Sequence, residues 1–468
     1  MPTRRQILGM ATAGATLGAA GLTAPLRAAI PDLRIQHAQY ALSDGLTEGL
    51  VSLSPDAPPP ALRVRQDETF EADVTNTLPD FTAMHWHGIR VPNGMDGVPY
   101  LTQIPIGQDE TFRYAFTPTD AGTYWYHPHC MTMDQMARGL TGILVVEEAE
   151  DPGFDDDLAL NLRDFRVGRD GQLLEAQWTA RGAARAGTFG ALMTANWEVE
   201  PAYPAPAGGL LRFRLAATDP TRIYKIFLTN AGGADGQPVT GRVIAMDGHP
   251  VREPVPWPTA EKPLFLSPGQ RADLALQVPA EEGREVLLIT ERPGAPRTLA
   301  RLIAKGPDTG RRLAEIGPLP PNPVSEPDLE SAAVQEFVFG WSPEKSASNN
   351  GVCGTLGYTF WSINRIPWPG DAAPSTGPLA TLKLGGSYIL RLRNESPNDH
   401  PIHLHGLTFR PLRSNRRQIR GNWTDTALLL REETMDVALV ADNPGDWAFH
   451  CHVIEHQKTG LAGYIRVA

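Results

Sequence analysis

The chain is poor in several features that would mark other classes of protein. Its 468 residues hold only three cysteines, so at most one disulfide can form within it. No segment has the apolar periodicity of a long amphipathic helix, which argues against a helical bundle. The formal net charge of −11 argues against nucleic acid or an anionic membrane as a partner. Glycine and proline are plentiful instead, at 45 and 43 residues, which suits β-domains rich in turns.

Alternation of apolar and polar residues predicts strands in three places. In residues 112–116, 211–215 and 390–393, apolar side chains alternate with arginine or another non-core residue. Successive side chains of a strand point to opposite faces, so this pattern is typical of strands buried on one face only. We therefore expect an all-β protein made of half-buried strands.

The sequence also repeats at a spacing of about 160 residues. The segment from Gly107 to His127 is similar to the segments from Pro268 to Thr290 and from Arg431 to His450. A period of this length corresponds to whole domains. Three β-sandwiches in tandem are therefore expected, with linkers near residues 150–157 and 317–327.

Ten of the twelve histidines lie in four short clusters near the two ends of the chain. The clusters are His85-Trp86-His87, His127-Pro128-His129, His400 to His405 with His403 between, and His450-Cys451-His452 followed by His456. Histidines two residues apart on a strand share a face, whereas the cysteine between two of them points the opposite way. The pattern predicts a thiolate metal site beside a cluster of imidazole sites. We interpret the two remaining histidines, His37 and His249, as buried core residues.

These four motifs, in this order, resemble those of the multicopper oxidases, the family that includes laccases. The likeness covers nearly everything after the first thirty residues. It implies three tandem cupredoxin-like Greek-key β-sandwich domains, at residues 30–150, 155–316 and 328–468. It also implies four copper ions per chain and coupling of donor oxidation to the four-electron reduction of dioxygen to water. The second domain has Leu288-Ile289-Thr290 where the others have an aromatic residue followed by His, so we expect it to act as a spacer without copper.

The resemblance assigns a ligand role to each position. The type 1 copper would be bound by His400, Cys451 and His456, the type 2 copper by His85 and His403, one type 3 copper by His87, His127 and His452, and the other by His129, His405 and His450. Leu461 stands at the axial position of the type 1 site, where a Met is common in the family. Because leucine offers no donor atom, we expect a high reduction potential. The donor is expected to deliver its electron at His400 and His456, near the surface.

Proton supply to the dioxygen site is expected to involve Asp96, which is thus a candidate catalytic residue with Cys451. Asp96 falls where the family keeps a carboxylate beside the type 2 site, although Asp-Gly is also an ordinary turn sequence. A second relay carboxylate, found in some bacterial members, is replaced by Gln457. Glu455 is near in sequence and could take its place.

With Cys451 assigned to copper, Cys130 and Cys353 remain. They could form a disulfide between the first and third domains, which would brace the neighbouring ligand His129. The alternative is two buried free thiols. We favour the free thiols here, since sequence cannot place the two residues within bonding distance.

The first 29 residues resemble a twin-arginine export signal. Arg4 and Arg5 precede a weakly apolar stretch that ends in small residues near Ala28 and Ala29. The apolar stretch is shorter than the roughly 20 residues that span a bilayer, so we expect cleavage and no stable membrane anchor. A soluble, monomeric periplasmic protein is predicted. Removal of the signal makes the net charge more negative by three.

The reducing substrate has two main interpretations. Phenols and aromatic amines are the first choice, as in laccases, and cuprous or another reduced metal ion is the alternative. Met131, Met133 and Met136 are the only methionine cluster, and we interpret them as core packing residues. A third alternative is a copper-free cell-division scaffold of the same fold, but that function would require missing ligands.

Overall fold

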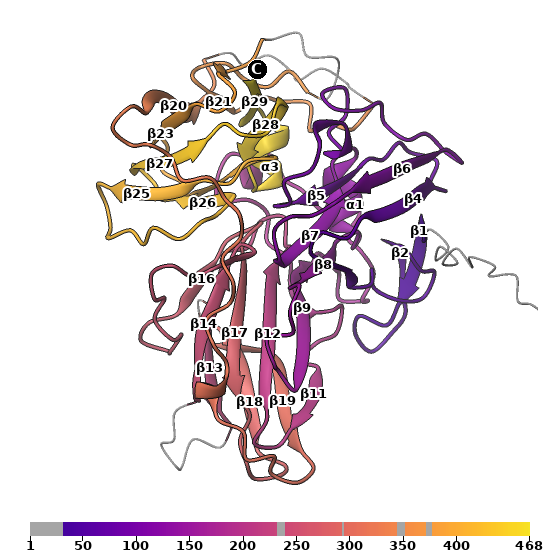
Figure 1. Cartoon of the computed structure of the whole chain (residues 1–468). Helices are drawn as coiled ribbons and strands as arrows, with labels where there is room; N and C mark the ends of the chain where they lie inside the picture. The colour runs from indigo at the N-terminus through magenta and orange to yellow at the C-terminus, as the bar shows by residue number, and fades with distance from the viewer. Residues whose placement is uncertain (1–30, 232–238, 293, 344–351, 371–376) are drawn as a thin grey trace, which may run out of the picture.

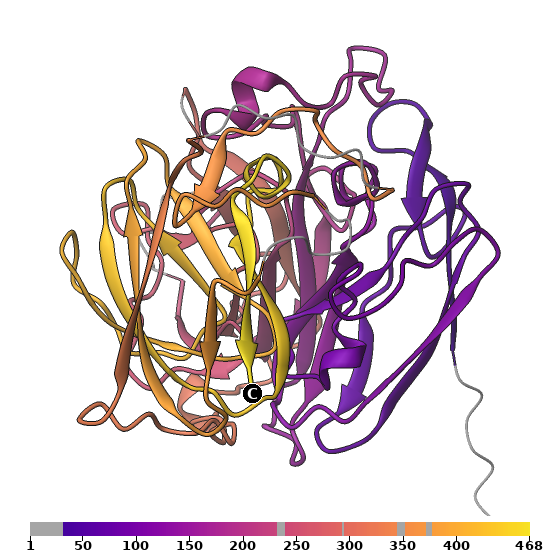
Figure 2. The same cartoon turned by 90° about the horizontal axis from the view of Figure 1, so that it is seen from above.

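The structure is a computed structural model that describes residues 31–231, 239–292, 294–343, 352–370 and 377–468. It is an all-β protein of three cupredoxin-like sandwiches, as predicted. Figure 1 shows the first sandwich in indigo and purple beside the third in orange and yellow, with the second below both. The view from above in Figure 2 again places the first and third side by side. The predicted export signal, residues 1–29, lies outside the described residues.

The first sandwich consists of two four-stranded sheets. One has the order β2 (Thr47–Ser52), β1 (Asp32–Tyr40), β4 (Phe70–Asn76), β6 (Thr111–Phe116), and the other has the order β3 (Leu62–Arg65), β8 (Gly142–Glu147), β7 (Gly122–Pro128), β5 (Met84–His87). A short 3-10 helix, Asn93–Met95, and helix α1, Thr132–Ala137, occupy its loops. Its core contains Trp86, Tyr114 and Tyr126.

The second sandwich has a six-stranded and a five-stranded sheet. The order of the first is β10 (Leu192–Ala195), β9 (Asp156–Phe165), β12 (Leu210–Ala217), β17 (Arg271–Gln277), β14 (Gly241–Met246), β15 (His249–Pro250), and that of the second is β11 (Ala202–Pro206), β19 (Arg297–Lys305), β18 (Glu285–Thr290), β13 (Tyr224–Asn230), β16 (Leu264–Leu266). Helix α2, Ala180–Ala183, precedes β10, and a 3-10 helix, Leu313–Glu315, follows β19.

The third sandwich has two five-stranded sheets. They have the orders β21 (Trp361–Ile363), β20 (Ala333–Trp341), β23 (Ser387–Asn394), β27 (Thr434–Val440), β25 (Arg410–Ser414) and β22 (Ala380–Leu382), β29 (Ala462–Val467), β28 (Gly445–Cys451), β24 (His400–Leu404), β26 (Thr426–Leu429). Helix α3, Ile454–Lys458, joins β28 to β29. Among the described residues, no helix is long and apolar enough to cross a membrane.

Two of the three alternating segments form half-buried strands, as predicted. Strand β6 buries Tyr114 and Phe116 and leaves Arg113 exposed, and β23 buries every second residue. The prediction was wrong for β12, which is buried on both faces. Its arginines lie at the boundary with the first sandwich, where Arg212 pairs with Glu148 at 2.7 Å. Alternation alone therefore could not distinguish an exposed face from one covered by another domain.

Cys130 and Cys353 form a disulfide, with their Cα atoms 4.5 Å apart. The favoured expectation of two free thiols was wrong, because the fold brings together residues 223 positions apart in sequence. The backbone supports the link, since the Met131 amide donates to the Cys353 carbonyl at 3.2 Å. The bridge ties the loop after His129 to the segment that precedes β21.

Candidate metal centre

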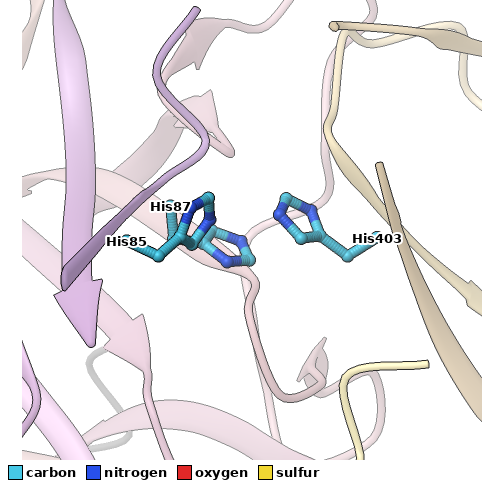
Figure 3. A group of neighbouring side chains, drawn as sticks. All are labelled: His85, His87 and His403. Atoms are coloured by element: carbon cyan, nitrogen blue, oxygen red, sulfur yellow. The ribbon is translucent and has the colours of Figure 1, made fainter. Parts of the chain in front are cut away.

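Four strands carry most of the predicted metal ligands into one interface. Strands β5 and β7 of the first sandwich pair so that His85 lies opposite His127, and β24 and β28 of the third pair so that His403 lies opposite His450. Figure 3 shows His85 and His87 approaching from one side and His403 from the other, with their rings turned toward one another. The interface between the two sandwiches is thus lined with imidazoles.

The imidazoles fall into groups whose potential ligand atoms lie within 4.8 Å of one another. These groups are His85 with His87 and His403, His87 with His127 and His452, and His129 with His405 and His450. The rings are packed tightly, with centroids 3.9 Å apart for His85 and His405 and 3.8 Å for His87 and His403. All eight histidines that the resemblance assigns to the type 2 and type 3 coppers, together the predicted trinuclear site, are therefore brought together, four from each outer sandwich.

The nitrogen atoms of these rings fit bound metal ions. Within the described part of the chain, buried ring nitrogens without a hydrogen-bond partner are His85 Nε2, His87 Nδ1, His127 Nε2, His129 Nδ1, His403 Nε2 and both nitrogens of His452. The Nε2 atoms of His405 and His450 face each other at 3.0 Å. Buried polar atoms rarely lack partners, so this concentration indicates coordination positions.

The other ring nitrogens are anchored by the protein, which fixes the tautomers. His85 Nδ1 donates to the Asp96 carbonyl at 2.8 Å, His127 Nδ1 to the Pro128 carbonyl at 3.0 Å, and His450 Nδ1 to the Cys451 carbonyl at 2.9 Å. Such contacts orient metal-binding imidazoles and leave the opposite nitrogen free for the metal. Burial lowers the pKa of His450 to about 3, so the ring is neutral at neutral pH, as metal binding requires.

A second site lies inside the third sandwich. Cys451 Sγ is 3.5 Å from both His400 Nδ1 and His456 Nδ1, and the two nitrogens are 3.1 Å apart. Two imidazoles and one thiolate in a triangle are the ligand set of a blue copper site. Leu461 is fully buried in the same apolar cluster as Cys451. Burial lowers the pKa of His456 to about 4, which keeps that ring neutral too.

This triad is covered rather than open to solvent. Both histidines are completely buried, so neither ring is itself exposed to solvent. His456 Nε2 donates to the Arg185 carbonyl at 2.5 Å, and His400 Nε2 lies 2.7 Å from Ser396 Oγ. Arg185 follows helix α2 of the second sandwich, so the second sandwich covers this site.

Asp96 is buried at the interface between the outer sandwiches. One of its carboxylate oxygens lies 3.0 Å from His405 Nδ1, and the other lies 3.3 Å from His85 Nδ1. A carboxylate in contact with imidazoles from both sandwiches can accept their N–H groups and offset positive charge. Its predicted role in proton supply stays a prediction.

The two candidates for a second relay group occupy different surroundings. Gln457 Nε2 lies 3.5 Å from His129 Nε2, so the amide stands against the imidazole cluster. Glu455 instead accepts a hydrogen bond from Thr188 Oγ1 at 2.7 Å and binds the Thr188 amide. Its carboxylate therefore ties α3 to the second sandwich, which argues against the relay role considered for it.

Sequence reasoning missed a carboxylate that touches the imidazole cluster. Asp425 Oδ1 accepts from His87 Nε2 at 3.1 Å, and the Asp425 carbonyl accepts from His403 Nδ1 at 2.9 Å. Burial by itself would raise the pKa of Asp425, but Arg271 and the two histidines hold it well below its ordinary value. Asp425 does not belong to any of the histidine motifs, so its contact with the imidazole cluster could be found only from the fold.

The two histidines outside the clusters differ from each other. His249 is buried, and Asn322 Nδ2 lies 3.1 Å from its Nδ1, as expected for a core residue. His37 is exposed on β1, so its assignment to the core was wrong.

The three methionines Met131, Met133 and Met136 occupy two kinds of environment. Met136 is a buried core residue, whereas the other two line a cavity of about 190 Å³.

Three cupredoxin-like sandwiches with a buried His₂Cys triad beside eight converging imidazoles define a copper-dependent oxidoreductase. Sequence models described as multicopper oxidase match residues 34–151 and 346–468. The chain therefore belongs to the multicopper oxidase family, an assignment that bears out the resemblance. It is an enzyme that uses copper and reduces dioxygen at the expense of a donor.

Individual relatives agree with this assignment. The multicopper oxidase MmcO of Mycobacterium tuberculosis is 28% identical over 95% of this chain and 90% of its own length. Laccase-2 of Botryotinia fuckeliana is 26% identical over 90% of this chain and 78% of its own. The crystal structure of a multi-copper oxidase from Pseudomonas thermotolerans has a TM-score of 0.81 and 39% identity, covering 94% of this chain and 100% of that one.

Proposed function

We propose that this multicopper oxidase is laccase-like and takes single electrons from phenols and aromatic amines. The observation that carries the proposal is the tripeptide His450-Cys451-His452, which joins the buried triad directly to the imidazole cluster. Copper bound at the two sites supplies one-electron acceptance from the donor and four-electron reduction of dioxygen to water. The protein supplies fixed, neutral imidazoles, a buried thiol and an interior from which bulk water is excluded.

We propose the ligand roles that the family resemblance implies. His400, Cys451 and His456 would hold the type 1 ion, and the side chain of Leu461, buried in the same apolar cluster as Cys451, would offer it no donor atom. His85 and His403 hold the type 2 ion. The two type 3 ions are held by the group His87, His127 and His452 and by the group His129, His405 and His450. The distances and the unpartnered nitrogens described above support these roles.

A cavity next to the triad supports an organic donor. It has a volume of about 670 Å³ and is lined by Phe189, Arg222, Asp399 and Val453 among others. Phe189 is 49% exposed, and the Arg222 guanidinium stands 5.0 Å from the centre of its ring. An exposed aromatic face beside cationic side chains is suited to a planar aromatic donor.

The cavity is connected to the triad through one peptide. Ala186 lines the cavity, and the preceding residue, Arg185, accepts the hydrogen bond from His456 Nε2. Val453 provides a second connection, because it lines the same cavity and its amide donates to Cys451 Sγ at 3.4 Å. An electron from a bound donor thus needs to cross only this backbone to reach a triad ligand.

One observation favours oxidation of a reduced metal ion as a second candidate function. The cavity near the disulfide is lined by Met131 and Met133 together with Asp134 and Glu175. Thioethers suit Cu(I), and carboxylates suit harder cations. Met133 also packs beside Ile454, the first residue of the helix that carries His456.

Oxygen consumption by the copper-loaded protein with a phenol, with Cu(I) and with Fe(II) decides between the two. The laccase-like proposal predicts the highest kcat/KM for the phenol. A higher value for either metal ion would overturn it in favour of the second candidate. No oxygen uptake with any donor, in protein shown to hold four coppers, would contradict the proposed oxidase activity altogether.

Variants of the two cavities sharpen this test. Phe189→Ala should raise KM for the phenol severalfold and leave oxidation of Fe(II) unchanged. Met133→Leu, which preserves volume, should affect Cu(I) alone. Phe81→Ala is the matched control, because Phe81 is a comparably exposed aromatic residue of the first sandwich, 40% accessible. Equal effects of Phe189→Ala and Phe81→Ala would separate the cavity from donor binding.

We further propose that the protein is a monomer exported to the periplasm, with domains at residues 30–150, 155–316 and 328–468. Export is supported by the Arg4-Arg5 pair and the apolar stretch that follows it. Replacing both arginines by lysine should leave the protein in the cytoplasm, which cell fractionation measures. Light scattering on the secreted form checks its mass. Periplasmic recovery of the double variant would contradict the twin-arginine route.

A further inference from the structure

The second sandwich, expected to be a spacer, reaches the imidazole cluster with one turn. The turn covers residues 267–270, is closed by a hydrogen bond from the Gln270 amide to the Ser267 carbonyl at 2.9 Å, and leads into β17. At Gly269 the φ angle is +95°, and an added Cβ would lie 3.0 Å from His87 Cε1 and 3.2 Å from His452 Cδ2. Only glycine permits such an approach without displacing a ring. The backbone of the second sandwich is therefore part of the wall of the site.

Arg271 continues this contact with its side chain. It is completely buried, and its guanidinium donates to both oxygens of Asp425, from Nη1 at 2.9 Å and from Nη2 at 2.6 Å. Its Nε donates to the Thr123 carbonyl at 3.1 Å, and Nη1 also donates to the Gly269 carbonyl at 2.9 Å. One arginine thus bonds to all three sandwiches, directly behind the imidazoles.

Asp425 passes this constraint on to two imidazoles. Its carboxylate bonds to His87 Nε2, its carbonyl bonds to His403 Nδ1, and its Oδ1 also accepts from Thr426 Oγ1 at 2.7 Å. These contacts direct His87 Nδ1 and His403 Nε2, which lack hydrogen-bond partners, into the cluster. A two-point guanidinium contact fixes the plane of the carboxylate, which a single ammonium charge cannot do.

We propose that Arg271 is a positioning residue of the trinuclear copper site, acting from the second sandwich through Asp425 on His87 and His403. The inference rests on the proposed ligand roles of those two histidines. The type 2 ion depends most on this support, because His85 and His403 are its only imidazole ligands. Loss of Arg271 should therefore weaken the trinuclear site while the type 1 triad, whose three ligands all belong to the third sandwich, is unaffected.

Arg212 provides a matched control for a purely structural role. It is also a buried arginine of the second sandwich, and it bonds to Glu148 of the first sandwich and to Asp273. Neither of those carboxylates is bonded to an imidazole of the cluster among the described residues. Arg212→Lys thus removes a comparable buried interdomain contact without touching the site.

The test compares full-length, copper-loaded Arg271→Lys and Arg212→Lys with the wild type. The readouts are copper per chain, the type 2 signal in electron paramagnetic resonance, the blue absorption and the thermal midpoint of the copper-free protein. We expect Arg271→Lys to retain the blue absorption and to bind the type 2 copper about tenfold to 100-fold more weakly, as for other outer partners of metal ligands. Arg212→Lys should keep all four coppers even where its midpoint falls.

Asp425→Asn keeps the inference testable where Arg271→Lys does not fold. An amide has only one acceptor oxygen, so the contact of the guanidinium with two separate oxygens is lost and the same selective loss of type 2 copper is expected. Wild-type copper affinity in either variant would overturn the inference, as would parallel loss of copper and stability in Arg271→Lys and Arg212→Lys. Wild-type protein without four coppers would contradict the proposed function instead, so the two failures are distinguishable.

Discussion

The two metal sites differ in how the chain builds them. The triad of His400, Cys451 and His456 comes from one sandwich and spans 57 residues of sequence, whereas the imidazole cluster draws four ligands from each outer sandwich. The ligands of the triad belong to a single folded domain, although the second sandwich covers them, whereas the ligands of the cluster meet only once the first and third sandwiches have docked. Perturbations at the boundary between these two sandwiches should therefore affect the cluster and spare the triad.

The largest effect is expected from a change at Cys451, which belongs to the triad and lies between two histidines of the cluster. Cys451→Ser should abolish the blue absorption and donor oxidation almost completely, because a hydroxyl is a hard donor without an efficient electron path to His450 and His452. Three coppers should stay bound in the cluster. Copper analysis and absorption spectroscopy measure both outcomes. A variant that stays blue would show that Cys451 is not the thiolate ligand.

Asp96→Asn should slow the reaction of the cluster with dioxygen while leaving the structure of the cluster intact. An amide keeps the shape and one acceptor facing His405, but it cannot carry a proton or offset positive charge. We expect normal reduction of the blue site and reoxidation by dioxygen at least tenfold slower, because acid–base assistance typically contributes about 10²- to 10⁴-fold. Stopped-flow mixing of reduced enzyme with oxygen isolates that half-reaction.

Asp120→Asn is the control for that experiment. Asp120 is another buried aspartate of the first sandwich, 2% exposed, and it pairs with Arg90 at 2.7 Å. Its loss should lower stability but leave reoxidation at the wild-type rate. Equal slowing in both variants would assign the effect to the fold of the first sandwich and leave Asp96 an ordinary turn residue.

Removal of the disulfide tests the docking side of the comparison. The Cys130→Ala/Cys353→Ala variant should lose about 2–5 kcal/mol of unfolding free energy, because the bridge closes a loop of 223 residues. Cys130 follows His129, so copper should be lost from the cluster before the triad. Denaturant unfolding of the copper-free protein and copper analysis of the loaded form measure the two effects. Equal loss from both sites would contradict the division drawn here.

What the sequence could predict follows from how local each feature is. Histidines that lie within five residues of one another can be recognised directly in the sequence. The alternation in β6 and β23 can also be recognised, because it involves only neighbouring positions. Arg271 and Asp425 are 154 positions apart, and each looks like an ordinary charged residue until the sheets are assembled. The contact of Arg185 with His456 could not be predicted either, since nothing near Arg185 in sequence indicates a metal site.

The smallest expected effect concerns the triad alone. Leu461→Met should lower the type 1 potential and slow the oxidation of high-potential phenols, since an axial thioether stabilises Cu(II) relative to Cu(I). Leu439→Met is the control, because Leu439 is equally buried in the same core cluster but lies on β27, in the opposite sheet from Cys451. Redox titration of both variants against the wild type measures the shift. If Leu461→Met leaves the potential unchanged while the cluster keeps its coppers, residue 461 is not axial. Hydrogen bonds to the ligands, such as the one from the Val453 amide to Cys451 Sγ, would then control the potential of this site.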